Sequence, residues 1–325
     1  MSSLKFFARK KTNYLFAPKR MLKRLFRKLL PNPLDSLLKK AARQGKKTFL
    51  IGWNRGLGDI PLGMYATLYR IKSFIPDAKV TFITRPDLCE GFQMLPGVEV
   101  LCCASWKRKH PCFLETSLLE LGRNSREWDV VIAQPDPTYW VKWQLGHLTP
   151  KLFWDPSWDD LVSAFPCTGD EKYIGVHVQT ETSYGYEKNW PLENFAALFK
   201  KLEECERKII LFGFGNTPEF PSSNIIDLRG KTTMRQMLSL IKNCCSHLLV
   251  PDSGVLSLTY FIDQSFPITI VSLWADPLQG VLKQNVVSPN PVLIHHPLIA
   301  KKGDLKNVSV EQVLEYIIPK KQSAI

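Results

Sequence analysis

The chain has 325 residues, which is long enough for two domains that each bury a core of their own. No stretch approaches the roughly 18 uninterrupted apolar residues needed to cross a bilayer, and the N-terminus lacks the apolar segment and small-residue cleavage site of a secretory signal peptide. The net charge is +13, but residues 1–47 hold 15 of the 43 lysines and arginines and only one of the 30 acids. The basic character therefore belongs to an N-terminal extension, and the nearly neutral remainder argues against a nucleic-acid-binding protein.

Residues 20–30 of this extension have an amphipathic pattern. Six apolar residues recur at helical spacing, four basic residues fill the opposite face, and Pro31 and Pro33 end the segment. Because basic amphipathic helices bind anionic membrane surfaces, we predict that residues 1–45 bind such a surface. A helix packed on the protein itself and a mitochondrial targeting peptide are the alternatives. A shorter helix is predicted over 34–43.

From Thr48 onward, strand patterns and helix patterns alternate. This alternation predicts βαβ units and hence a parallel sheet. The first series has strands at 48–53, 79–84, 98–102 and 129–133, and helices at 60–74, 87–95 and 113–122. Residues 134–170, rich in Pro, Trp and Asp, predict loops and a short helix that lead to a second domain.

A second series of the same kind begins at Tyr173. Strands are predicted at 173–178, 208–213, 225–228, 247–250 and 267–273, and helices at 191–205, 232–243 and 254–262. A last helix opens at Ser309, where Gln312 is placed for a capping box. We therefore predict an extension over 1–47 and two parallel-sheet domains over 48–168 and 169–325.

The eight cysteines form no C-x-x-C pair and no zinc spacing. A disulfide scaffold is also not expected in a chain of this length. We therefore expect reduced thiols in a cytoplasmic protein.

Two glycine-containing turns, at 56–59 and 251–254, each follow a predicted strand and precede a predicted helix. Ligands of open α/β sheets bind at the carboxyl ends of strands, so the two turns predict one phosphate-bearing ligand held across a cleft. Gly56 and Gly58 allow close backbone approach, and Asp59 either takes a proton from an attacking hydroxyl or caps a helix.

The second turn offers a hydroxyl and backbone N–H groups to an anion, in Asp252, Ser253 and Gly254. An ordinary helix cap is the alternative, and the charge of Asp252 suits a sugar hydroxyl better than a phosphate. Lys188, just before a predicted helix, is either a point charge for a diphosphate or a surface lysine. Trp190 beside it is interpreted as a packing residue.

Several catalytic and metal-binding motifs are absent from the sequence. It has no D-x-D, P-loop or H-E-x-x-H motif, and we interpret His295 and His296 as structural rather than metal-binding. We therefore predict no metal and no cofactor.

Four segments together resemble glycosyltransferase family 9, the ADP-heptose:lipopolysaccharide heptosyltransferases. The resemblance covers about 48–285, and its segments occur in the family's order. They are Gly58-Asp59 with 60–62 and 74–78, then 188–191, then 227–233, and finally 252–254.

This resemblance implies a GT-B fold, in which two Rossmann-like domains face a cleft, and an inverting, metal-independent sugar transfer. It implies that Asp59 is the general base, that Lys188 contacts the donor, and that Asp252, Ser253 and Gly254 form the donor-binding loop. Ser183 and Glu219 fall near donor-contacting positions. The chain departs from the family pattern at Ser257, where the family usually has His, and at residues 55–57, where serines are common.

The resulting hypothesis is a glycosyltransferase that moves a sugar, with heptose as the first candidate, from a nucleotide diphosphate sugar to a lipopolysaccharide-type acceptor. We expect it at the inner face of the cytoplasmic membrane. The alternatives are an inactive family member that binds a nucleotide sugar or saccharide, and a nucleotide-sugar epimerase of the same fold.

Overall fold

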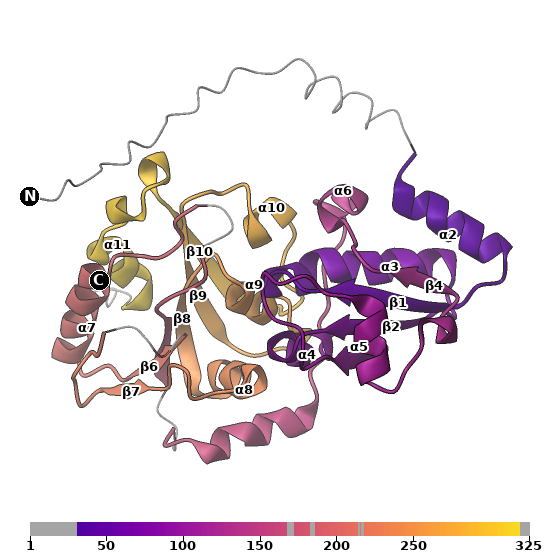
Figure 1. Ribbon diagram of the computed structural model, residues 1–325. Coiled ribbons are helices and arrows are strands. Elements are labelled where there is room, and N and C mark those ends of the chain that lie inside the picture. The colour runs from indigo at the N-terminus through magenta and orange to yellow at the C-terminus, as the bar shows by residue number, and fades with distance from the viewer. Residues whose placement is uncertain (1–30, 168–171, 183–185, 214, 216–217, 319–325) are drawn as a thin grey trace, which may run out of the picture.

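The computed structural model describes residues 31–167, 172–182, 186–213, 215 and 218–318. The described residues form two lobes, each built on a parallel sheet (Figure 1). The predicted helix at 20–30 and the predicted domain boundary at 168/169 both lie outside the described residues. Within them, no helix combines the length and apolarity that crossing a membrane requires.

The N-terminal sheet has the strand order β3-β2-β1-β4. Each pair of neighbours is parallel, as the alternating pattern predicted. Its strands are β1 (Thr48–Trp53), β2 (Lys79–Thr84), β3 (Val98–Cys102) and β4 (Val130–Ile132). The helices of this half are α2 (Pro33–Arg43), α3 (Tyr65–Phe74), α4 (Pro86–Phe92), α5 (Leu114–Glu120) and α6 (Pro137–Trp140).

The C-terminal sheet has the strand order β10-β9-β8-β5-β6-β7 and is also parallel. Counted from its own first strand, this is the 3-2-1-4-5-6 order of a dinucleotide-binding fold. Its strands are β5 (Tyr173–His177), β6 (Ile209–Phe212), β7 (Ile225–Asp227), β8 (Cys245–Pro251), β9 (Ile268–Trp274) and β10 (Leu293–Ile299). Its helices are α7 (Leu192–Glu204), α8 (Met234–Cys244), α9 (Gly254–Tyr260), α10 (Gly280–Gln284) and α11 (Val310–Ile317).

Helix α2 corrects the predicted extent of the basic extension. Leu34 and Leu38 are completely buried in the core of the N-terminal half, and Asp35 pairs with Arg70 of α3 at 2.7 Å. Residues 33–43 are therefore part of the folded domain, because their apolar face is covered by it. The proposed boundary at residue 47 is wrong for this helix.

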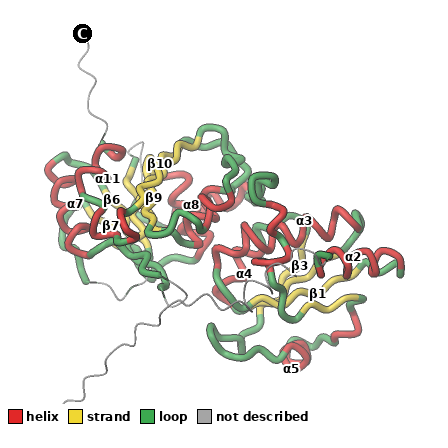
Figure 2. The backbone as a smooth tube through the Cα atoms, turned by 90° about the horizontal axis from the view of Figure 1, so that it is seen from above, coloured by secondary structure: helices red, strands yellow, loops and turns green. Residues whose placement is uncertain are grey.

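A linker joins the two lobes along one side of the molecule. It contains the 3-10 helix Pro156–Ala164 (η5), which packs against α8 (Figure 1). The view from above shows the two lobes side by side (Figure 2). The hydroxyl of Ser239 on α8 donates to the carbonyl of Trp158 at 2.6 Å. The C-terminal helix α11 begins at Ser309 with the predicted capping box to Gln312.

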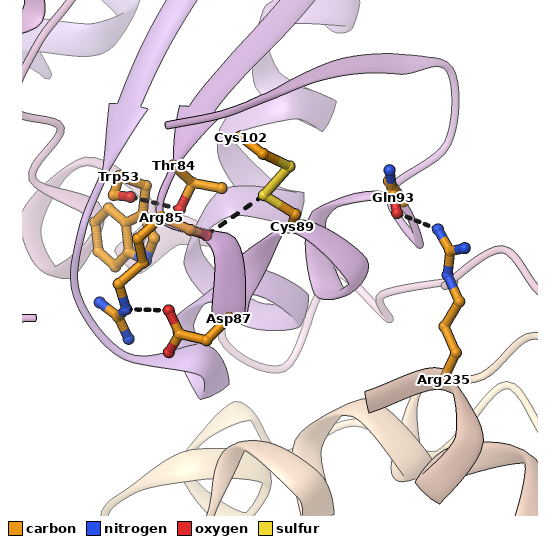
Figure 3. Close-up of a disulfide and its surroundings, with 8 residues drawn as sticks. All are labelled: Trp53, Thr84, Arg85, Asp87, Cys89, Gln93, Cys102 and Arg235. Atoms are coloured by element: carbon orange, nitrogen blue, oxygen red, sulfur yellow. Dashed lines mark hydrogen bonds and ion pairs between the residues drawn. A yellow bond between two sulfur atoms is a disulfide. The ribbon is translucent and has the colours of Figure 1, made fainter. Parts of the chain in front are cut away.

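A disulfide between Cys89 and Cys102 contradicts the expectation that all cysteines are reduced. Cys89 lies on α4 and Cys102 ends β3, with their Cα atoms 5.9 Å apart (Figure 3). No sequence pattern indicated this pair, because the distance between two cysteines depends on how the helix packs on the sheet. The other six cysteines are free.

Candidate functional site

A cleft of about 1500 Å³ lies where the two lobes face each other. Residues of both halves line it, including Asp59 and Arg85 from the first and Lys188, Asp252 and Gly254 from the second. The lining residues follow the carboxyl ends of β1, β2, β5, β6 and β8. β1 lies between β2 and β4, and β5 lies between β8 and β6, so the cleft includes the points where the strand order of each sheet reverses. Ligands of open α/β sheets bind at such points.

The two turns singled out in the sequence touch each other. A Cβ atom on Gly58 would lie 3.5 Å from the Cα of Gly254, and a Cβ on Gly254 would lie 2.6 Å from the Cβ of Leu57. Real Cβ atoms do not approach so closely, so position 254 has room for glycine alone. The absence of a side chain there lets the first turn meet the start of α9.

Asp59 ends the short 3-10 helix Leu57–Asp59 and precedes the π-helix Ile60–Met64. Its side chain makes no capping hydrogen bond, so the helix-cap interpretation of this residue does not hold. Burial raises the pKa of the Asp59 carboxyl, while the nearby charges of Arg55 and Lys188 oppose that rise. A half-buried carboxylate with a raised pKa, beside a cleft, is a typical general base.

Lys188 and Asp252 form an ion pair on the opposite side of the cleft. Their Nζ and Oδ2 atoms are 2.8 Å apart, and the Asp252 side chain is only 7% exposed. The hydroxyl of Tyr186 donates to the same Oδ2 at 2.5 Å. Lys188 is therefore not the solvated surface lysine of the alternative interpretation, since its ammonium is fixed at the cleft by a buried partner.

Tyr186 is a residue of this cluster that sequence reasoning missed. Burial and the hydrogen bond to Asp252 raise the pKa of its phenol, which stays protonated and continues to donate. The Lys188 ammonium also lies 4.9 Å from the centre of the Tyr186 ring. A lone tyrosine outside any motif gives no sequence signal for such contacts.

Ser253 serves as the cap of helix α9. Its hydroxyl accepts from the backbone N–H of Leu256 at 3.3 Å, as the cap interpretation predicted. Ser257, one turn later, is buried and donates to the carbonyl of Ser253 at 3.3 Å. Both residues also border the cleft, so capping and ligand contact are compatible here.

Other residues predicted from the sequence have mixed outcomes. Gly56 and Gly58 line the cleft, whereas Glu219 is exposed and does not, so the structure does not bring Glu219 to the site. Ser183 lies outside the described residues. Trp190 is buried and donates to the carbonyl of Val308 at 2.9 Å, which confirms its packing role.

Arg85, also missed by sequence reasoning, holds the loops on the N-terminal side of the cleft. Its guanidinium donates to Asp87 at 2.6 Å (Figure 3). It also donates to the side-chain oxygen of Asn54 and to the carbonyl of Arg55, both at 3.0 Å. Its side chain is only 4% exposed. Arg85 therefore fixes the loop that carries Asp59.

Three further contacts bridge the lobes. Arg108 of the N-terminal half pairs with Glu181 of the C-terminal half at 3.5 Å, and both border the cleft. The backbone N–H of Arg235 on α8 donates to the Glu90 carboxylate on α4 at 2.9 Å. The Arg235 guanidinium also contacts Gln93 (Figure 3). These contacts keep the lobes close around the cleft.

The described part of the chain contains no group of three or more His, Cys, Asp or Glu side chains placed to hold a metal ion. His295 instead contacts the hydroxyl of Ser272 at 2.6 Å, and His296 stacks on Tyr316. Both histidines have structural partners, as interpreted from the sequence.

Comparison with known proteins connects this geometry to a family. Residues 155–263 match the model of glycosyltransferase family 9 (heptosyltransferase). A comparison with curated protein sequences finds no match.

Solved structures give the same picture of the fold. The Escherichia coli ADP-heptose lipopolysaccharide heptosyltransferase II is 17% identical, with a TM-score of 0.58 over 83% of this chain and 97% of that chain. A family 9 glycosyl transferase from Veillonella parvula is 16% identical, with a TM-score of 0.55 over 83% and 95%. The E. coli heptosyltransferase WaaC with ADP is 14% identical, with a TM-score of 0.50 over 83% and 98%. These likenesses confirm the predicted GT-B-type fold.

Proposed function

We propose that the chain, whose residues 155–263 match glycosyltransferase family 9, is a glycosyltransferase that catalyses an inverting, metal-independent transfer from a nucleotide diphosphate sugar to a lipopolysaccharide-type saccharide. Heptose is the first candidate for the sugar. The observation that carries the proposal is the meeting of the two turns, which places the Asp59 carboxylate near the Lys188–Asp252 pair in one cleft. A transfer reaction needs a base for the acceptor and a cation for the diphosphate, and in this proposal Asp59 and Lys188 supply them in one cleft.

In this proposal Asp59 takes the proton of an acceptor hydroxyl. The acceptor oxygen then attacks the anomeric carbon from the face opposite the diphosphate, and the bond from that carbon to the diphosphate oxygen breaks. A single displacement of this kind inverts the configuration at the carbon. The raised pKa of Asp59 supports the role, because a carboxylate with a higher pKa is a stronger base.

Lys188 would stabilise the negative charge that develops on the departing diphosphate. Its ammonium is already oriented by Asp252, so little side-chain freedom is lost when the donor binds. Asp252 would repel a phosphate, so we assign it to a sugar hydroxyl in addition to its role as the partner of Lys188. With a fixed ammonium in place, the proposal assigns no step to a metal ion.

A second candidate is an inactive relative that binds a nucleotide sugar without turnover. Ser257 favours it, because its hydroxyl is held by the Ser253 carbonyl at a position where the resembled family usually has His. A nucleotide-sugar epimerase shares the fold and would be recognised by its product.

The test is an incubation of the full chain with ADP-, UDP- and GDP-linked sugars. Thermal stabilisation by one donor, followed by release of its nucleoside diphosphate when a lipopolysaccharide-core acceptor is added, is the expected result. Stabilisation without release would favour the inactive binder. An epimerised donor would identify the epimerase, and full activity loss in EDTA would contradict metal independence.

A further inference from the structure

His177 is a buried residue of the cleft to which no role has been given so far. It is the last residue of β5 and is 6% exposed. β5 lies between β8 and β6, so His177 stands at the point where the strand order of the C-terminal sheet reverses. The neighbouring strand β8 leads directly into Asp252. His177 and Asp252 both line the cleft.

The imidazole of His177 has no hydrogen-bond partner among the described residues. Its Nδ1 atom is enclosed and unpartnered. The Nε2 atom lies toward Gly213, where an added Cβ would be 3.9 Å from it. His295, a half-buried histidine of the same sheet, has Ser272 as its partner. An unpartnered buried polar group costs folding free energy, so packing alone does not explain an imidazole at position 177.

The surroundings of the ring leave room for a ligand group. Gly213, Gly215 and Gly230 border the cleft beside it and carry no side chains. Gly213 has φ +124°, a conformation that other residues rarely adopt, so this space is a property of the backbone. Burial lowers the pKa of His177 to about 4, and the ring is therefore neutral at physiological pH.

We propose that the Nε2 edge of His177 binds a hydroxyl group of the nucleotide sugar donor, which makes His177 a donor-binding residue. A neutral imidazole offers one N–H or one lone pair at that edge, and a hydroxyl can pair with either. Phosphate oxygens only accept and are bound best by charged donors, and Lys188 supplies such a donor elsewhere in the cleft. This inference rests on the proposed function, because it assumes that the ligand is a nucleotide sugar.

Binding by the full chain tests the inference without requiring turnover. ADP, UDP and GDP are titrated calorimetrically, and the tightest binder is carried forward with its nucleotide sugar, with its 2′-deoxy and 3′-deoxy forms and with inorganic diphosphate. The variants are His177→Phe, which keeps the volume, His177→Asn, which keeps a polar atom near Nδ1 only, and His177→Gln, which places an amide near Nε2. His295→Gln is the matched control, since His295 lies half-buried in the same sheet but does not line the cleft.

We expect His177→Phe and His177→Asn to weaken nucleotide-sugar binding about tenfold, the scale of one buried hydrogen bond, and nucleotide binding by the same factor if the hydroxyl belongs to the ribose. His177→Gln and His295→Gln should bind nearly as the parent does. Inorganic diphosphate, which has no sugar hydroxyl, should bind parent and His177→Phe equally. Loss of the difference in one deoxy nucleotide would identify a ribose hydroxyl. A difference that appears only with the nucleotide sugar would assign the contact to a hydroxyl of the transferred sugar, and a difference that persists in both deoxy nucleotides would contradict a ribose hydroxyl.

Three results would overturn the inference. Equal affinities of the parent and His177→Phe for both the nucleotide and the nucleotide sugar would remove His177 from the site. An equal loss for inorganic diphosphate would make the contact one to phosphate. If His177→Phe melts at a lower temperature than the parent, His177→Asn and His177→Gln are compared instead. Equal affinities of these two variants would contradict a contact at Nε2. If none of the nucleotides binds the parent chain, the proposed function itself fails, and the inference fails with it.

Discussion

Asp59 combines a raised pKa with a side chain that caps no helix. Since burial is the main cause of the raised pKa, the folded protein binds the proton of this carboxyl more tightly than the unfolded chain does. The folded state therefore loses stability as the pH rises from the unfolded pKa through the folded one. At neutral pH the charged carboxylate is thus unfavourable for folding, although the proposed reaction requires it.

Asp59→Asn should consequently lower transfer by about a hundredfold or more, the scale of a general base, and raise the melting temperature at pH 7. In the parent, the transfer rate should increase with pH as Asp59 loses its proton. In Asp59→Asn, the pH dependence of the transfer rate should lack this increase. Asp77→Asn is the control, because Asp77 is an exposed partner of Lys47 far from the cleft lining. Near-normal transfer by Asp59→Asn would contradict the mechanism.

Lys188→Gln should weaken nucleotide-sugar binding about tenfold at low salt. Glutamine keeps a donor for the buried Asp252 but removes the charge that would meet the diphosphate, so a loss of affinity is not simply a loss of folding. The difference from the parent should shrink as salt is added, since salt screens the lost attraction. Lys200→Ala on the exposed face of α7 is the matched control. Equal affinities of parent and Lys188→Gln at all salt concentrations would remove Lys188 from the donor site.

The sequence predicted part of this site because some of its residues follow turn patterns. Gly58, Asp59 and Asp252 follow strands in recognisable turns, and Lys188 lies in a segment that resembles a known family. Tyr186, Arg85 and His177 could not be found in this way. Their roles come from contacts with residues that are distant in the sequence or from burial at a strand end.

At the scale of elements, apolar periodicity predicted the strands that are buried on both faces. β10 was missed because it is an edge strand that contains Pro297 and two histidines, a composition that does not read as a strand. Helix α10 was missed because five residues are too few to show a helical period. The Cys89–Cys102 disulfide joins two correctly predicted elements, but their packing was unknown.

The contact between the first turn and helix α9 gives a prediction at this scale. Gly254→Ala should reduce transfer by up to about a hundredfold, because the new Cβ would force Leu57 and the Asp59 turn away from the donor side. Gly58→Ala provides the matched comparison, since its Cβ would meet Gly254 at an ordinary 3.5 Å. The measurement compares transfer rates at saturating donor, and melting curves compare the stability of the two variants. A smaller loss of transfer in Gly254→Ala than in Gly58→Ala would show that this contact does not position the Asp59 turn against the donor side of the cleft.

At the scale of the whole molecule, strand order explains why one cleft can hold both substrates. Each sheet reverses its order next to its first strand, and these reversal points face each other across the contact of Gly58 with Gly254. The sequence predicted two parallel sheets from alternation alone. It could not place one sheet against the other, because that arrangement rests on a few contacts such as Arg108–Glu181 and Arg235–Glu90.

The start of helix α2 shows where the predicted membrane anchor ends and the folded N-terminal half begins. Helix α2 buries Leu34 and Leu38 in the core, so a deletion to residue 45 would damage the N-terminal half. Residues 1–30 contain ten basic residues and no acid. A deletion of residues 1–30 therefore removes the predicted anchor and leaves α2 in place.

This deletion should abolish strong binding to anionic vesicles at low salt. Under the membrane proposal, each lysine or arginine near the surface adds about 1 kcal/mol of attraction to anionic lipid, and the apolar face of 20–30 inserts beside the headgroups. Replacing Leu25 and Phe26 by Ser should weaken binding through the apolar face alone, with the charge unchanged. Sedimentation with phosphatidylglycerol vesicles makes the measurement, with neutral vesicles and 0.5 M salt (about a 4 Å screening length) as controls. The truncated chain should still bind its nucleotide sugar, because both sheets and the cleft are intact. If it sediments with anionic vesicles as the full chain does, the extension is not the anchor, and a helix packed on the protein becomes the better interpretation.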